Sequence, residues 1–166
     1  MKFYKMYIIS LSNSVQLYIL LTLIFNLSFL LCSCNPKPDP INFNSDKCVN
    51  CSMTISDKKW GAELVTSKAK VYKFDSIECM ALYFLAFDKN NPDTKVFSVW
   101  TINYLIPGEL IDAEKSIYVR SNSFHSPMGL NTASFLTEAE ASEYLKSDTN
   151  KKLDWKGVLN TVQHDW

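Results

Sequence analysis

Two cysteines and a methionine lie close together in the short run Cys48–Met53 (CVNCSM). Their sulfur atoms are soft, polarisable donors, and such donors select Cu(I), and less strongly Zn(II), over cations that prefer oxygen. Cys48 and Cys51 alone form a Cys-x-x-Cys pair, which is typical of zinc sites, disulfides and redox pairs alike. Met53, two residues after Cys51, favours monovalent copper among these. The run therefore predicts a soft-metal site.

Further potential ligands lie later in the chain. Met128 stands between Pro127 and a glycine, in a loop where no helical or strand periodicity assigns it to a core. His125 in the same loop offers an imidazole, a donor of intermediate softness. Cys79 lies in the first turn of a predicted helix, where unpaired amides favour a thiolate. Cys79 fits equally well as a small buried apolar side chain, so its role stays open here.

Alternatives for Cys48 and Cys51 differ in what else they need. A structural zinc site needs a second pair of cysteines or histidines at finger-like spacing, and the sequence has no such pair. A thioredoxin-type pair stands at a helix N-terminus, whereas residues 53–57 (MTISD) favour a strand and a turn. A plain disulfide remains possible if the chain is exported.

Charge and motif content exclude other classes of function. The chain carries 17 basic and 17 acidic residues, a balance that argues against nucleic-acid binding, which needs a basic patch to displace counterions. There is no Gly-x-Ser-x-Gly motif and no glycine-rich phosphate loop, and the whole sequence has only four glycines. We therefore predict a protein that is not an enzyme.

The N-terminus predicts export and a lipid anchor. Lys2 and Lys5 precede an apolar run over residues 17–31, which has the length of a signal-peptide core rather than of a membrane span. The run ends in the letters LCSC, which resemble a bacterial lipobox. We expect residues 1–33 to be a lipoprotein signal peptide and Cys34 to carry the lipid. An uncleaved N-terminal membrane anchor is the alternative.

The mature chain then begins with a predicted tether. Residues 34–47 contain three prolines and few apolar side chains, which is typical of an extended, flexible segment. Asn35 gives no aspartate-type signal for retention in the inner membrane, so a periplasm-facing protein on the outer membrane is favoured. Besides the anchor, Cys48, Cys51 and Cys79 remain, and an odd number of cysteines cannot all pair internally.

Periodicity predicts the elements that position these donors. Alternating apolar residues between turn residues predict strands over residues 60–65, 70–74, 95–104, 116–120, 130–135 and 155–162. Asp75 with Glu78, and Thr137 with Glu140, have the spacing of capping boxes. They predict helices over residues 75–87 and 137–146.

Pro107-Gly108 divides these elements into two halves with the same order, β-β-α-β. We expect an α+β fold in which a first half, residues 48–106, packs against a second, residues 107–166. The pair Cys48 and Cys51 belongs to the first half and Met128 to the second, so packing of the halves would bring the donors together.

The chain resembles the NosL family of copper-binding lipoproteins, accessory proteins for nitrous oxide reductase, over roughly residues 46–145. The motifs that carry the resemblance are the lipobox at Cys34, residues 51–53 (CSM), residues 73–80 (KFDSIECM) and residues 126–129 (SPMG). The resemblance implies a fold of two similar ββαβ halves and one Cu(I) per protein, handed to an exported cuproenzyme.

It also implies a ligand set. Cys51 and Met53 match the family's Cys-x-Met motif, and Met128 matches its Met-Gly motif. Cys48 is an addition to that set and is expected to be auxiliary, with Cys79 and His125 nearby. The rival hypothesis is a thiol–disulfide oxidoreductase that uses Cys48 and Cys51, in which both methionines would be dispensable. A structural lipoprotein with a disulfide and no transferable ligand is a third possibility.

Overall fold

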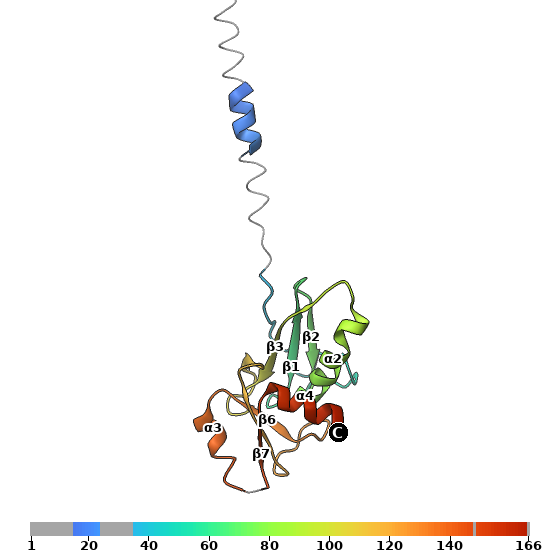
Figure 1. Cartoon of the computed structure of the whole chain (residues 1–166), viewed down its shortest axis with the longest axis vertical. Helices are drawn as coiled ribbons and strands as arrows, with labels where there is room; N and C mark the ends of the chain where they lie inside the picture. The colour runs from blue at the N-terminus through green and yellow to red at the C-terminus, as the bar shows by residue number, and fades with distance from the viewer. Residues whose placement is uncertain (1–14, 24–34, 148, 166) are drawn as a thin grey trace, which may run out of the picture. The chain divides into compact units, whose positions relative to one another are not determined.

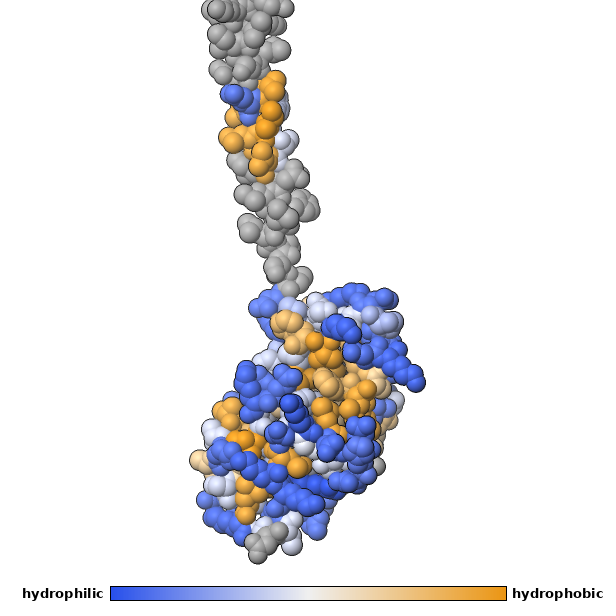
Figure 2. Space-filling view, viewed as in Figure 1, coloured by the Kyte–Doolittle hydropathy of each residue, from blue (hydrophilic) through white to orange (hydrophobic). Residues whose placement is uncertain are grey.

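A computed structural model describes residues 15–23, 35–147 and 149–165 of the chain. The chain divides into two compact units, Met1–Asn35 and Pro36–Trp166 (Figure 1). In the first unit, residues 15–23 form a helix that exposes apolar side chains such as Leu17 and Leu20 (Figure 2). Among the described residues, no helix has the length and apolar character needed to span a membrane. Cys34 and most of the predicted signal peptide lie outside the described residues.

A four-stranded antiparallel sheet forms the first half of the second unit. Its strands are β1 (Ala62–Thr66), β2 (Val71–Phe74), β3 (Val96–Ile102) and β4 (Leu110–Asp112), in the order β2-β1-β3-β4. The strands predicted over residues 60–65 and 70–74 are confirmed as β1 and β2, which pair as a hairpin with Ala62 opposite Phe74. β4 follows the predicted boundary at residues 107–108 and pairs with β3. Periodicity did not indicate this strand because it has only three residues.

Helix α2 (Ile77–Asn90) follows β2, but its cap differs from the predicted one. Ser76, not Asp75, is the N-cap, and its side chain accepts a hydrogen bond from the amide of Cys79. The predicted capping box of Asp75 and Glu78 is therefore wrong by one position. Both carboxylates are buried and point to other partners, described below.

A three-stranded antiparallel sheet forms the second half, in the order β6-β5-β7. It consists of β5 (Ile117–Arg120), β6 (Thr132–Phe135) and β7 (Lys151–Leu153). The predicted capping box of Thr137 and Glu140 is confirmed at the start of α3 (Glu138–Ser142). The helix is shorter than predicted.

The predicted strand over residues 155–162 is wrong, because this segment is helix α4 (Trp155–His164). Asp154 caps it by accepting from the Gly157 amide at 2.7 Å. Trp155, Val158 and Val162 recur at helical spacing and are buried together. The β-branched residues in this segment favour a strand locally, and packing of the apolar stripe overrides that preference.

The helical state of α4 has a testable consequence. We expect Asp154→Ala to lower the free energy of unfolding by about 1 kcal/mol, because the Gly157 amide loses its acceptor at the helix N-terminus. Denaturant unfolding measures this, and Lys156→Ala, an exposed substitution in the same helix, serves as the control. Equal stability of the two variants would contradict the assigned cap.

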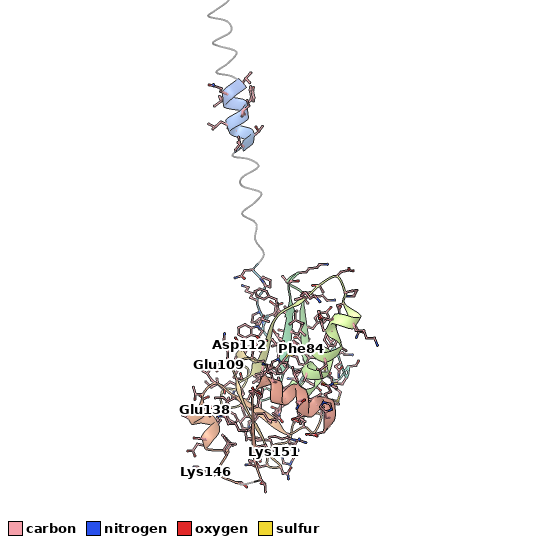
Figure 3. The ribbon with its side chains drawn as sticks, viewed as in Figure 1. Phe84, Glu109, Asp112, Glu138, Lys146 and Lys151 are labelled. Atoms are coloured by element: carbon pink, nitrogen blue, oxygen red, sulfur yellow. The ribbon has the colours of Figure 1, made fainter. Side chains whose placement is uncertain are left out.

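The main core joins the two halves, as an α+β fold of packed halves requires. Helices α2 and α4 lie against each other (Figure 1). Phe84 of α2, labelled in Figure 3, belongs to this contact. Its ring meets that of Trp155 in α4 edge-on, with ring centroids 5.5 Å apart. Tyr118 and Leu130 from the second half are fully buried in the same cluster as residues of the first sheet. The cluster also contains the side chains of two of the candidate ligands, Cys48 and Cys79.

Part of the stretch predicted as a tether lies against the domain. Ile41 is buried with Ile55 and Ile102. Lys73 donates to the Pro40 carbonyl and forms an ion pair with Asp46, both at 2.8 Å. These contacts fix the entry of the chain into the turn that carries the first cysteines.

Candidate metal centre

The run Cys48–Met53 forms a tight turn that precedes β1, with residues 54–61 between them. The Cys48 amide donates to the Met53 carbonyl at 2.8 Å, and the Ser52 amide donates to the Cys48 carbonyl at 2.9 Å. Ser52 has a φ of 67°, the left-handed conformation that closes such a turn. The Val49 amide donates to the Lys73 carbonyl of β2 at 2.9 Å. The turn is thereby held beside the residues that connect β2 to α2.

Four potential metal donors converge at this point. The thiol sulfurs of Cys48, Cys51 and Cys79 and a carboxylate oxygen of Asp75 all lie within 4.8 Å of one another. Cys48 and Cys79 are buried, whereas Cys51 is half-buried and reaches the surface. The three thiols are free rather than disulfide-bonded. We call these four residues the thiol cluster.

Local structure explains how residues far apart in sequence meet here. Cys79 lies in the first turn of α2, and Asp75 precedes its cap, so both face the turn that carries Cys48 and Cys51. The Cys51 thiol donates to Asp75 Oδ2 at 3.2 Å, and the Cys51 amide donates to Cys48 Sγ at 3.5 Å. The side-chain amide of Asn50 donates to Cys79 Sγ at 3.6 Å.

The three thiols differ in acidity. The hydrogen bond from Cys79, together with the amides of Cys51 and Asp75, lowers the pKa of Cys48 to about 6 against the effect of burial. Burial, together with the bond to Asp75, raises the pKa of Cys51 to about 11. The hydrogen bond that Cys79 gives to Cys48 raises the pKa of Cys79 above its ordinary value, and burial adds to this. Of the three thiols, Cys48 therefore has the lowest pKa.

The methionines lie at two edges of this arrangement. Met53 closes the cysteine turn and is 42% exposed. Met128, from the loop between β5 and β6, is half-buried and packs against the core cluster that contains Cys48 and Cys79. His125 in that loop is exposed and does not belong to the thiol cluster. Ligand roles for Met53, Met128 and His125 stay predictions.

Two acidic residues near the site have roles that the sequence did not indicate. The sequence predicts Asp75 as a helix cap, and the structure places it among the thiols. Glu78 was assigned to the same capping box, and its carboxylate instead bonds Ser126 and Leu130 of the Met128-bearing loop. The motif KFDSIECM, which places both acids beside Cys79, was the signal that could have suggested a shared site.

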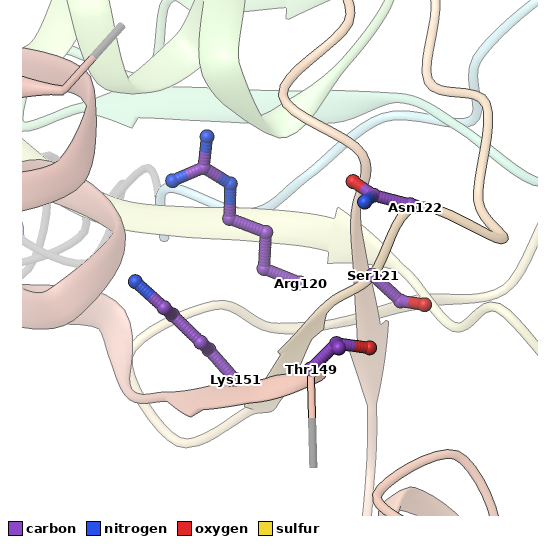
Figure 4. Close-up of a pocket in the computed structure, with 5 residues that line it drawn as sticks. All are labelled: Arg120, Ser121, Asn122, Thr149 and Lys151. Carbon is purple, nitrogen blue, oxygen red and sulfur yellow. The ribbon is translucent and has the colours of Figure 1, made fainter. Parts of the chain in front are cut away.

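A second feature, a surface hollow of about 230 Å³, lies beside β5 and β7 (Figure 4). It is lined by Arg120, Ser121, Asn122, Thr149 and Lys151. The side chains of Arg120 and Lys151 extend to the same side of the hollow. Its lining is polar and cationic and includes none of the predicted ligands. The thiol cluster is therefore the candidate metal centre.

Comparison with known proteins identifies a family and a fold. The family model described as NosL matches residues 40–161. The crystal structure of the copper chaperone NosL from Shewanella denitrificans is similar to the chain, with a TM-score of 0.58 and 20% sequence identity. The match covers 74% of this chain and 96% of that one. At this identity the likeness shows a common fold. A comparison with curated proteins gives no match.

Proposed function

Since the chain belongs to the NosL family, we propose that it is a copper chaperone that binds one Cu(I) and delivers it to an exported cuproenzyme such as nitrous oxide reductase. The observation that carries the proposal is the convergence of three thiol sulfurs within 4.8 Å, together with Asp75. Thiolates select Cu(I) over hard cations, and burial of two of the three removes competing water.

The site offers more sulfur than the family's motifs alone imply. Cys51 is the central ligand of the proposal, with Met53 in the same turn and Met128 from the other half as thioethers. Cys48 and Cys79 are close enough to Cys51 to share the ion. Binding of Cu(I) would displace the thiol proton of Cys51, which forms the hydrogen bond to Asp75. The Asp75 carboxylate would then lie beside the metal as a hydrogen-bond acceptor or weak ligand.

Delivery requires that the ion can be reached from outside. Cys51 is half-buried and Met53 is 42% exposed, so the proposed ligands form a graded path from the interior to the surface. An acceptor thiol or thioether could replace Met53 first, while the buried thiols still hold the ion. Lipid attachment at Cys34 and a position facing the periplasm belong to the proposal, because exported acceptors would be met there.

Cu(I) titration tests this function. We expect the mature protein, under reducing conditions and in competition with a chromogenic Cu(I) chelator, to bind one equivalent of Cu(I) and to exclude Mg²⁺ and Ca²⁺. The selectivity follows from the sulfur donors. Metal analysis after gel filtration provides the stoichiometry. Failure to compete with the chelator would contradict the proposal.

One observation favours a second candidate, a thiol–disulfide oxidoreductase. The pKa of Cys48 is lowered to about 6, as in reactive thiols. In a redox pair, the thiol that attacks the substrate is both acidic and accessible. Here the acidic thiol, Cys48, is buried, and the accessible thiol, Cys51, has a pKa raised to about 11. Cys48 and Cys51 also lie in a turn rather than at a helix N-terminus. Copper binding therefore fits the geometry better.

A further inference from the structure

Glu78 is a fully buried carboxylate directly before Cys79 in α2. Burial of such a group is costly unless it has hydrogen-bond partners. Its Oε1 accepts from the Ser126 hydroxyl at 2.5 Å and from the Leu130 amide at 3.3 Å. Its Oε2 has no hydrogen-bond partner among the described residues. Both of these hydrogen bonds reach a segment 48 or more residues away in the sequence.

The segment that Glu78 holds is the Met128 loop, which we define as residues 121–131. Ser126 and Leu130 lie two residues before and after Met128, so one carboxylate oxygen anchors both sides of the methionine. The loop has its own frame: the Asn131 amide donates to Ser126 Oγ at 2.9 Å, and the Ser126 amide donates to Asn131 Oδ1 at 3.2 Å. These internal bonds shape the loop, and Glu78 fixes it to α2.

The same helical turn thus faces both parts of the site. Cys79 points its sulfur to the thiol cluster, and its neighbour Glu78 bonds the loop of Met128. We propose that Glu78 is a positioning residue, which holds Met128 at the thiol cluster so that its thioether can complete the Cu(I) site. This inference rests on the proposed function and goes beyond it, because the hydrogen bonds of the Glu78 carboxylate go to Ser126 and Leu130, which are not proposed ligands, so that Glu78 acts through the loop.

Three substitutions separate this role from a structural one. Glu78→Leu removes the acceptor, Ser126→Ala removes the shorter bond and leaves the helix intact, and Glu78→Gln keeps an oxygen acceptor. We expect the first two to weaken Cu(I) binding by about 10- to 100-fold, as is common when a residue that orients a ligand is lost. Glu78→Gln should stay near the parent. Ser126→Ala also decides the question if Glu78→Leu fails to fold.

Two controls make the result specific. Glu63 is another fully buried carboxylate, located in β1, and Glu63→Leu should disturb packing without changing Cu(I) affinity. Met128→Ala should weaken binding as Glu78→Leu does, and the double variant should be no weaker than Met128→Ala alone, because both changes remove one interaction. X-ray absorption at the copper edge should show one sulfur ligand fewer in Glu78→Leu than in the parent.

The outcomes distinguish this inference from the proposed function. If the parent does not bind Cu(I), the proposed function fails. If Met128→Ala weakens binding but Glu78→Leu and Ser126→Ala do not, only the positioning role is overturned. If Met128→Ala binds like the parent, the inference is overturned and the thiol cluster remains as the site. Additive losses in the double variant would also overturn it, since Glu78 would then act independently of Met128.

Discussion

Replacing Cys51 by alanine is expected to weaken Cu(I) binding by more than about 100-fold, a larger loss than is usual for residues outside the ligand set. The exposure of Cys51 is intermediate between that of the buried thiols and that of Met53, and Cys51 is the thiol that donates to Asp75. In the proposed copper chaperone, its loss would remove a thiolate ligand and also interrupt the proposed path of release. Competition titration with a Cu(I) chelator measures the effect.

The position of Cys51 also makes its variant easy to interpret. Because the side chain is half-buried, Cys51→Ala leaves a smaller cavity than truncation of a fully buried residue would, and we expect the fold to be retained. Val49→Ala, an exposed change in the same turn, is the matched control and should bind like the parent. Unchanged affinity in Cys51→Ala would remove Cys51 from the ligand set.

Substitution of Cys48 separates the two candidate functions. In a thiol–disulfide oxidoreductase, Cys48 would be indispensable, since it carries the lowered pKa. In a copper chaperone, Cys51 and Cys79 still offer two thiols within reach of each other and of Asp75. For a copper chaperone, we therefore expect the Cys48 variant to retain tight Cu(I) binding and to lack a reversible disulfide.

The parts of the site that could be read from the sequence are those with local signals. The spacing of Cys48, Cys51 and Met53 is visible in one short run, and the soft character of sulfur does not depend on the fold. The order of the first elements was also predictable, because turn residues and apolar alternation bound each strand. The NosL-like α+β fold follows from that order together with the motifs.

What escaped prediction depends on contacts between distant segments. The Glu78 carboxylate has the spacing of a cap partner, and only the packing of the halves brings Ser126 to it, 48 residues away. Asp75 was misassigned for the same reason, since its partner Cys51 belongs to a turn before β1. In α4, burial against α2 outweighs the local preference of its β-branched residues.

A second large effect is expected from Glu63, whose carboxylate is fully buried in β1. Its Oε2 accepts from the Asp39 amide at 3.1 Å, and its Oε1 has no hydrogen-bond partner among the described residues. Burial raises the pKa of Glu63 from 4.5 to about 7, against the bond from Asp39 and the charge of Lys73, which lower it. The folded state therefore holds the Glu63 proton more tightly than the unfolded state does.

This difference fixes the sign of the pH dependence. The stabilising contribution of the proton is fully present below the unfolded pKa of 4.5 and is lost as the pH rises through about 7. The shift corresponds to roughly 3 kcal/mol. Glu63→Gln has no proton to lose, so we expect its stability relative to the parent to increase by this amount between pH 4.5 and pH 8. Denaturant unfolding at several pH values measures the difference.

The comparison isolates Glu63 because all other groups titrate in both proteins. Glu114→Gln, an exposed carboxylate in the same domain, should run parallel to the parent over this range. Parallel curves for Glu63→Gln and the parent would mean that the carboxylate finds water or a counter-charge on ionisation, and would contradict a buried, proton-holding Glu63.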